Sequence, residues 1–421
     1  MSTPMHARVP AIAIVGAGPA GCYTAQALRK RMPEAHLVVF DQLPVPYGLL
    51  RYGVAADHQG TKAVCAQFER LFRRDAVEFR GGVRVGVDDG GCDVTVADLR
   101  EAFDVVVLAT GLATDRRLGV AGENVHGVIG SGRLTRALNS HPDETGSPPE
   151  VGRRVAVVGA GNIAVDVVRL LLRSPSEWTN SDMDPKILNR IVPEPVESID
   201  VIVRASAYNA KWDAAMIREL GDLGRAQFQS ASLPREGPDE PRVSALRDLV
   251  DSDRIGDATV TFHFDAVVQS LGSCNGDLER VVIRTASGSL QEIPVDTVIT
   301  AIGFESDASV VADGVYAAGW LATGPRGTIP QQRALAQDLA ALIASHLGPA
   351  ERSAARAGLL ALNLPNAVDY DAWCRIDATE QSQAHPDRVR RKLSSHALLW
   401  AASHPANSSP ADTAAKERVP A

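Results

Sequence analysis

Short apolar runs alternate with polar or glycine-rich turns along most of the chain, a pattern that predicts strands alternating with helices. The first apolar run covers 11–15 and leads into the turn G-A-G-P-A-G at 16–21, and a helix is expected over 20–31. A second apolar run at 37–40 ends at Asp41. We therefore predict a buried strand, a tight glycine turn, a helix and a second buried strand.

The first glycine turn has the G-x-G-x-x-G form that binds the pyrophosphate of a dinucleotide. Gly16 allows the tight turn, Gly18 lets the backbone approach the pyrophosphate, and Gly21 lets the helix lie close to the strand. The helix N-terminus offers free N–H groups and a positive dipole end to the phosphates. Asp41 lies about 20 residues after Gly21, where an acid binds the ribose hydroxyls.

The same order recurs in the middle of the chain. An apolar strand at 154–158 leads into G-A-G-N-I-A at 159–164, and a helix follows to Leu172. The third small residue of this second turn is alanine instead of glycine. Two such turns, each at a strand–helix junction, are hard to explain by chance and imply two nucleotides that face one another.

The remaining periodicity predicts further strands, helices and loops. Apolar positions 64, 68, 71 and 72 indicate an amphipathic helix over 61–74. Further strands are expected at 77–79, 83–87, 94–96, 104–111, 199–203, within 258–303 and at 314–320, and further helices at 131–139, 206–228 and 331–347. Polar segments containing proline predict loops at 144–152 and 232–242 and an excursion over 174–200.

Composition and charge narrow the class of protein. The chain has 421 residues, of which 45% are hydrophobic and 22% charged, and a net charge of −8, which argues against nucleic-acid binding. It lacks an uninterrupted apolar run of about 18 residues, so no membrane span is expected, and 1–10 does not resemble a signal peptide. Its five cysteines show no C-x-x-C spacing, so no metal or iron–sulfur site is expected, and their odd number fits a reducing cytoplasm.

Three segments carry a resemblance to a known family. They are L-P-V-P-Y-G-L-L-R-Y-G-V-A-A-D-H at 43–58, the G-x-G-N-x-A-x-D form at 159–166, and Y-x-A-G-W-x-x-x-G-P-x-G-x-I at 316–329. The chain resembles the adrenodoxin reductase type of ferredoxin–NADP reductase over most of its length. The resemblance implies that FAD occupies the first nucleotide site and NAD(P) the second. It also implies that 43–58 lies over the isoalloxazine ring of the flavin.

The predicted fold class is α/β, with two Rossmann-like three-layer dinucleotide-binding domains, the second inserted in the first. We expect the FAD-binding domain to span 1–111 and 314–402, and the NAD(P)-binding domain to span 112–313. The crossings are placed near Gly111 and Asp313, and 403–421 is expected to be a disordered tail.

The resemblance also implies roles for three candidate catalytic residues. His58 matches the active-site histidine of the family, and Asp222 occupies the place of the acid that partners it, where the family has glutamate. Trp320 matches the tryptophan that lies beside the flavin ring. Two alternatives stay open: Asp222 as a solvated helix residue, and Trp320 as a plain core aromatic.

The remaining candidate site residues bind the two cofactors, FAD and either NADPH or NADH. They follow the two glycine turns, the strand ends and the segments matched to the family. They are Gly16, Gly18, Pro19, Ala20, Gly21, Asp41, Gly48, Leu49, Thr110, Gly111, Gly159, Gly161, Asn162, Ile163, Arg204, Glu219, Gly319, Trp320, Gly327, Thr328 and Ile329.

The expected site for the 2′-phosphate of NADP departs from the family pattern. In the family, two adjacent arginines follow the second strand and grip this phosphate, but here Arg204 is followed by Ala205. Lys211 or Arg218 could make looser contacts. Losing one charge-assisted pair predicts weakened discrimination, with NADH accepted within about a hundredfold of NADPH.

These features predict a reductase that moves electrons from NAD(P)H through FAD to a small iron–sulfur ferredoxin. Two other classes stay open, because 322–323 and 330–332 depart from the family pattern: a flavin-dependent oxidoreductase acting on a small organic substrate, and a non-catalytic flavin-binding partner protein. Both glycine turns are intact, which disfavours the second class, and the lack of an added substrate domain disfavours the first. The expected protein is a cytoplasmic monomer that binds neither nucleic acid nor membrane.

Overall fold

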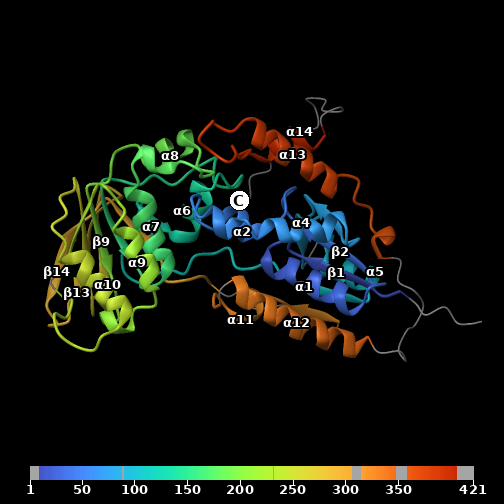
Figure 1. Ribbon diagram of the computed structural model, residues 1–421, viewed down its shortest axis with the longest axis horizontal. Coiled ribbons are helices and arrows are strands. Elements are labelled where there is room, and N and C mark those ends of the chain that lie inside the picture. The colour runs from blue at the N-terminus through green and yellow to red at the C-terminus, as the bar shows by residue number, and fades with distance from the viewer. Residues whose placement is uncertain are drawn as a thin grey trace, which may run out of the picture.

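The computed structural model describes residues 9–87, 90–230, 232–305, 314–327, 329–347 and 358–404. They form two lobes, one mostly blue with orange and red elements, the other green to yellow (Figure 1). Each lobe contains one large sheet in which every strand pairing is parallel. The predicted α/β fold class is confirmed.

The first lobe is built on a five-stranded sheet in the order β16-β6-β1-β2-β3. Its strands are β1 (Ala11–Val15), β2 (His36–Asp41), β3 (Glu78–Gly81), β6 (Val105–Leu108) and β16 (Val315–Ala317). Strand β16 pairs with β6 although the whole second lobe separates them in sequence. The chain therefore leaves the first lobe, builds the second and returns, as expected for an inserted unit.

Both faces of this first sheet are covered, which gives three layers. On one face lie α1 (Pro19–Arg31), α2 (Gly48–Tyr52), α4 (Cys65–Arg73), α12 (Ile329–His346) and α13 (Tyr370–Ser382), with α1 and α12 side by side (Figure 1). On the other face lie α5 (Val96–Ala102), β4 (Val85–Gly86), β5 (Val94–Thr95) and η3 (Gly358–Ala361).

The second lobe is built on a six-stranded sheet in the order β10-β11-β9-β8-β15-β7. Its strands are β7 (Val128–Gly130), β8 (Arg154–Val158), β9 (Ser198–Ile202), β10 (Ala226–Gln229), β11 (Ala258–His263) and β15 (Thr297–Thr300). Helices α6 (Ser131–Leu138), α7 (Asn162–Leu172), α9 (Ala214–Leu220) and α10 (Pro241–Val250) cover one face. An antiparallel sheet of β12 (Val267–Cys274), β13 (Asp277–Arg284) and β14 (Leu290–Pro294) covers the other.

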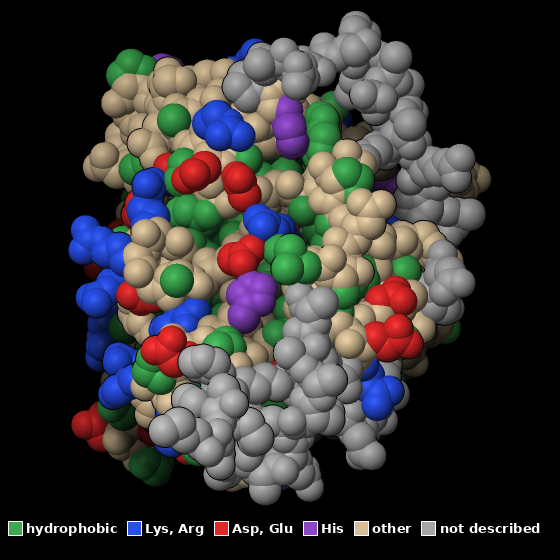
Figure 2. Space-filling view, turned by 90° about the vertical axis from the view of Figure 1, so that its right-hand side faces the viewer, with side chains coloured by type: hydrophobic (Ala, Val, Ile, Leu, Met, Phe, Trp, Pro, Cys, Tyr) green, Lys and Arg blue, Asp and Glu red, His purple; other side chains and the backbone are tan. Residues whose placement is uncertain are grey.

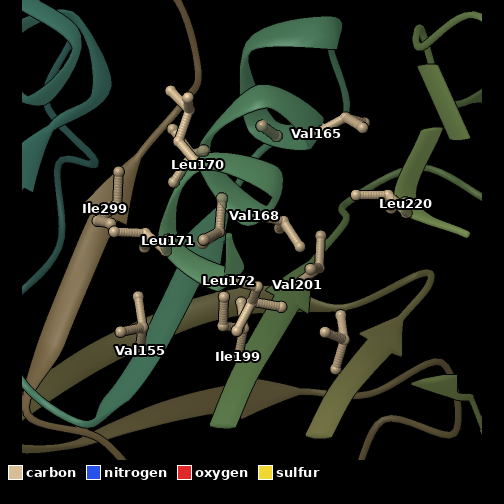
Figure 3. Packing of buried hydrophobic residues seen from close by; sticks show 14 of the residues in the cluster. Val155, Val165, Val168, Leu170, Leu171, Leu172, Ile199, Val201, Leu220 and Ile299 are labelled. Carbon is tan, nitrogen blue, oxygen red and sulfur yellow. The ribbon is translucent and has the colours of Figure 1, made fainter. Parts of the chain in front are cut away.

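Helix α7, which begins at the second glycine turn, is anchored by its apolar face. Leu171 and Leu172 point from α7 toward Val155 of β8 and Ile199 of β9 (Figure 3). All four side chains are at most 4% exposed. Because burying each such side chain stabilises the fold by about 1.5–3 kcal/mol, the helix N-terminus is held firmly over the sheet edge.

Two expected helices are shorter than predicted. The helix expected over 61–74 is two helices, α3 (Gln59–Lys62) and α4, with a short interruption between them. The side chain of Lys62, the last residue of α3, points inward and bonds to Asp182 of the second lobe. Of the helix expected over 206–228, only α9 and the short η2 (Ala207–Asn209) form. Its last residues are strand β10, because Ala226 and Phe228 are buried alternately beside β11.

The segments expected as loops contain helices of their own. The excursion over 174–200 holds η1 (Pro175–Trp178) and α8 (Pro185–Ile191). Helix α10 begins at Pro241, inside the loop expected over 232–242, and the Glu240 side chain accepts a hydrogen bond from the Arg242 N–H. Proline at the first helical position after a capping acid is a typical helix start.

The C-terminal segment spans both lobes. After α13 it runs toward α8, where Asn180 N donates to Asp387 O (2.7 Å) and Val389 N to Ser181 O (3.0 Å), before α14 (His396–Ser403). Ser403 ends α14, while 405–421 of the expected tail and the crossing near Asp313 lie outside the described residues.

The end of the first lobe that faces away from the second carries basic and acidic side chains interspersed, with basic ones gathered along one edge (Figure 2). Among the helices of the described ranges, none combines the length and the apolar character that crossing a membrane requires.

Candidate functional site

The first glycine turn is built so that only glycine fits its key positions. Gly16 has φ +107°, and a Cβ there would lie 2.3 Å from the Ala109 carbonyl oxygen. A Cβ on Gly21 would lie 1.9 Å from the Gly16 carbonyl oxygen. Gly18 is open by comparison, with its nearest neighbour, the Gly48 Cα, at 3.9 Å from such a Cβ. Two glycines therefore close the turn, and the third leaves room for a phosphate.

Asp41 lies at the end of β2 and faces this turn. Its Oδ2 accepts a hydrogen bond from Ala17 N (2.9 Å) and its Oδ1 one from Leu43 N (3.0 Å). Burial raises the pKa of the Asp41 carboxyl to about 6, although these two backbone N–H groups act in the opposite direction. The carboxyl keeps unused lone pairs that can accept ribose hydroxyls.

Three other predicted segments meet the first turn. Thr110 N lies near Gly16, and Thr110 and Gly111 follow β6 at the same sheet edge. Gly48 and Leu49 open helix α2, and Tyr47 N donates to Ala17 O at 2.9 Å.

The third segment is the turn at the start of α12. A Cβ on Gly319 would lie 2.5 Å from the Ala20 Cβ, so this turn packs directly against the start of α1, which begins with Pro19. Gly327 and Ile329 follow at the start of α12, whereas Thr328 lies outside the described residues. The turn and the start of α12 thus face the first glycine turn.

Gln332 is a residue that the sequence did not single out as a cofactor contact. It is 6% exposed, and neither its Nε2 nor its Oε1 has a hydrogen-bond partner among the described residues. Its Oε1 lies 3.7 Å from where a Cβ on Gly319 would be, and its Nε2 3.4 Å from that of Gly327. An unpartnered buried amide beside a glycine cradle fits a polar ligand, and this supports the fit of FAD to the site.

The second glycine turn has the same construction. A Cβ on Gly159 would lie 2.3 Å from the Ala301 carbonyl oxygen, whereas Gly161 has no atom within 4 Å of such a position. Asn162 and Ile163 begin α7, and the Asn162 amide both donates to Asp213 Oδ2 (2.7 Å) and accepts from Asp213 N (2.8 Å). The open backbone at Gly161 again leaves space for a pyrophosphate.

His58 lies where the two lobes meet, and its ring faces two carboxylates of the second lobe. Its Nε2 is 3.4 Å from Glu219 Oε2, and its Nδ1 is 3.9 Å from Asp166 Oδ1. Asp222 is exposed and makes no ion pair with His58 among the described residues, so the expected pairing is wrong and Glu219 takes that place. Asp222 lies beyond the end of α9, on the far side of Gly221.

Trp320 is half-buried at the first residue of α11 (Trp320–Thr323). Its ring centroid is 5.6 Å from that of Phe304, which follows β15 of the second lobe. The alternative of a plain core residue is therefore disfavoured, because a core tryptophan would be enclosed on all sides. The ring lies at the boundary of the two lobes, near the turn that packs on α1.

Around His58, ion pairs tie the two lobes together. Asp57, beside His58, pairs with Arg169 and, at 2.8 Å, with Arg173, both on the second lobe. Arg169 is 2% exposed and also contacts Asp166 (2.6 Å) and Glu219 (3.6 Å). The sequence analysis missed Asp166 and Arg169; the aspartate of the second G-x-G-N-x-A-x-D turn was the available signal.

Comparisons with known proteins agree with this geometry. Residues 10–200 match the family model of pyridine nucleotide-disulphide oxidoreductases. The chain is 41% identical over 416 residues to cindoxin reductase of Citrobacter braakii, covering 91% of this chain and 89% of the relative. It is 28% identical over 454 residues to human mitochondrial NADPH:adrenodoxin oxidoreductase, covering 92% and 90%.

Among solved structures, FprA of Mycobacterium tuberculosis in complex with NADPH superimposes with a TM-score of 0.86 at 27% sequence identity, covering 94% of this chain and all of that one. The agreement extends over both lobes, each with its own glycine turn. The chain therefore belongs to the adrenodoxin reductase type of ferredoxin–NADP reductases and is a flavoprotein oxidoreductase that binds FAD and NADPH.

Proposed function

We propose that the protein carries electrons from NADPH to a small iron–sulfur ferredoxin, with FAD on the first lobe and the coenzyme on the second. The observation that carries this proposal is the placement of His58 at the junction of two lobes that each carry a glycine turn, with its ring facing Glu219 and Asp166. When bound by these residues, FAD would supply the chemistry that the chain lacks, which is acceptance of a hydride from NADPH and release of its two electrons one at a time to two ferredoxin molecules.

The residues of the chain bind and position the two nucleotides. The turn at 16–21 and Asp41 hold the FAD pyrophosphate and ribose, and the turn at 159–164 holds the coenzyme pyrophosphate. Trp320 and the start of α12 would hold the flavin ring, and the unpartnered amide of Gln332 would be available to hydrogen-bond with it. This arrangement orients the two rings and keeps water away from them.

Anaerobic titration of the purified protein with NADPH, followed by its flavin spectrum, tests the first half-reaction. We expect a yellow protein with one FAD that bleaches on addition of NADPH. A colourless protein that gains no flavin on incubation contradicts the proposal. A yellow protein that no nicotinamide coenzyme bleaches is the non-catalytic partner protein considered above.

Cytochrome c reduction tests the second half-reaction. We expect it to depend on added ferredoxin. Because one relative is named for cindoxin, cindoxin is the second acceptor to test. Electron transfer to neither protein, with rapid oxidation of NADPH by a small organic compound, favours the alternative of a small-substrate oxidoreductase.

We also propose that the protein works as a monomer in the cytoplasm. The odd number of scattered cysteines without C-x-x-C spacing supports the compartment. Size-exclusion chromatography with light scattering on the FAD-bound protein measures the oligomeric state. The mass of a dimer contradicts the proposal.

A further inference from the structure

An open pocket of about 420 Å³ with charged side chains in its lining lies in the second lobe at the carboxyl end of β9. Its charged lining residues are Arg204, Asp265 and Arg284, and Thr285 adds a hydroxyl. Lys211 and Arg218, the looser alternatives considered from the sequence, do not line it. The end of the second strand of a Rossmann unit is where the 2′ position of the adenine ribose lies, so this pocket is at the place where NADPH and NADH differ.

Backbone pairing explains how Arg284 reaches this pocket from another part of the chain. The loop after β9 pairs with the loop after β11, since Asp265 N donates to Ala205 O (3.1 Å) and Ala266 N to Val203 O (3.0 Å). Val267 of β12, two residues after Asp265, lies directly opposite Arg284 of β13. The antiparallel sheet that covers the second lobe thus delivers Arg284 beside Arg204.

Both arginines are available to an anion. Each is exposed, and within the described part of the chain neither side chain makes a hydrogen bond or an ion pair. Arg280, on the same strand, is different because it pairs with Glu292 at 3.4 Å. Guanidinium forks bind phosphate oxygens in pairs and stay charged at all relevant pH values.

We propose that Arg284 supplies the second guanidinium of the NADPH 2′-phosphate site. It would replace, from a different strand, the arginine that the family has at the position of Ala205. This inference rests on the coenzyme placement of the proposed function. It revises the expected weak discrimination, which considered only residues adjacent to Arg204 in sequence. With Arg284 in place, the preference for NADPH exceeds the hundredfold limit expected from Ala205.

Asp265 makes Arg284 more important. Two guanidinium groups and one carboxylate leave the pocket with a net positive charge. Without Arg284, the charges of Arg204 and Asp265 cancel, and the carboxylate is free to accept the 2′-hydroxyl of NADH. Loss of Arg284 therefore shifts selectivity from NADPH toward NADH.

Titration calorimetry on the FAD-bound protein with adenosine 2′,5′-bisphosphate and with 5′-AMP tests this role apart from electron transfer. Arg284→Gln is expected to weaken binding of the bisphosphate by about ten- to a hundredfold, with little change for 5′-AMP. Arg204→Gln is expected to behave in the same way. The ratio of kcat/KM for NADPH to that for NADH falls in parallel, mainly through the KM for NADPH.

Arg280→Gln is the matched control, because it removes the same charge from the same strand about 13 Å away. It is expected to leave both nucleotide affinities unchanged. Equal bisphosphate affinity in Arg284→Gln and Arg280→Gln overturns the inference. Arg284→Lys, which keeps the charge but not the fork, is expected to bind the bisphosphate with intermediate affinity and provides the test if the glutamine variant fails to fold.

The result stays separate from the test of the proposed function. If the bisphosphate binds through Arg204 and Arg284 but no acceptor protein is reduced, the electron-transfer proposal fails and the phosphate site stands. If acceptors are reduced and Arg284→Gln keeps the full preference for NADPH, the inference about Arg284 is overturned alone.

Discussion

The ring of His58 is held by carboxylates that belong to the other lobe. With Glu219 3.4 Å from Nε2 and Asp166 3.9 Å from Nδ1, its orientation depends on how the lobes meet. We expect His58→Ala to slow reduction of bound FAD by NADPH roughly ten- to a hundredfold, because positioning at the junction is lost. FAD should stay bound, since the first glycine turn is untouched. Stopped-flow absorbance and the ratio of FAD to protein measure the two effects.

Glu219→Gln and Asp222→Asn form a matched pair that tests which acid acts on His58. Each removes one negative charge in or just after α9. The first should slow flavin reduction, and the second, at an exposed side chain, should leave the rate unchanged. If Asp222→Asn slows flavin reduction as much as Glu219→Gln, Asp222 is the acid that acts on His58, as expected from the sequence. If His58→Ala loses its FAD, the role of His58 is to maintain the FAD site and not to support flavin reduction.

Replacing Gln332 is expected to affect the stability of the FAD-free protein and the affinity for FAD in opposite directions. Its buried amide has no partner among the described residues, and such a group costs about 1–3 kcal/mol. Gln332→Leu should therefore leave the FAD-free protein equally or more resistant to thermal unfolding, while weakening FAD binding by roughly tenfold. Thermal melts with and without FAD, together with fluorescence titration of the flavin, measure both quantities. Unchanged FAD affinity would show that the amide does not face the cofactor.

Single residues were predictable where their requirement is local. Gly21 is needed because a Cβ there would collide with the Gly16 carbonyl of the same motif, and Gly16 is needed because the tight turn has a positive φ; both requirements are visible in the motif itself. The partner of His58 was not predictable, because Glu219 and Asp222 are separated by less than one helical turn and only tertiary packing selects between them. Arg284 is likewise far in sequence from Arg204.

At the scale of elements, a buried ionic cluster fixes the C-terminal segment to both lobes. Lys62 Nζ and Lys392 Nζ both contact Asp182 Oδ2, at 2.8 and 2.9 Å, and both donate to Asn139 Oδ1. Lys62, Lys392, Asp182 and Asn139 are each at most 8% exposed. Burial lowers the pKa of Lys392 well below its ordinary value, although Asp182 opposes this effect. The ammonium groups thus depend on one carboxylate.

Removing that carboxylate should be costly. Asp182→Asn leaves two buried ammonium groups without a counter-charge, and we expect a loss of about 3–5 kcal/mol in the free energy of unfolding. The double variant Asp182→Asn with Lys392→Met should recover part of this loss, because it removes one of the uncompensated charges. Chemical denaturation of the unchanged protein, the two single variants Asp182→Asn and Lys392→Met, and the double variant measures the cycle. Equal stability of the single variant and the unchanged protein would contradict the role of the cluster.

The pattern of apolar residues predicted elements well where the whole element is buried. Strands β1 and β6 are continuous apolar runs with glycine turns or loops on both sides, which a parallel sheet requires, and β8 is such a run after its first residue, the exposed Arg154. The pattern failed where a few residues change role within a short span. The helix expected over 61–74 is interrupted between Lys62 and Cys65, and 226–229 joins a sheet edge whose partner strand lies about 30 residues away in sequence.

For the whole molecule, the two lobes have to hold two nucleotides in register, and this arrangement was predictable because each lobe carries its own turn. The contacts between the lobes were not, since they join side chains that share no local pattern. Asp57, 6% exposed in its side chain, pairs with Arg169 and Arg173 just before His58. An ion-paired contact between the lobes thus lies directly beside His58 in the chain.

Asp57→Asn should therefore separate nucleotide binding from electron transfer. Both nucleotide turns remain intact, so we expect FAD content and the affinity for NADPH to change little, whereas flavin reduction slows about tenfold or more because the two rings are less well aligned. Small-angle scattering should show a larger radius of gyration. Glu69→Gln, which removes an exposed ion pair with Arg73 within the first lobe, is the control and should change neither quantity. If Asp57→Asn reduces its flavin at the normal rate with unchanged dimensions, the lobes are held together by their other contacts, and the pairing of Asp57 with the two arginines contributes only to stability.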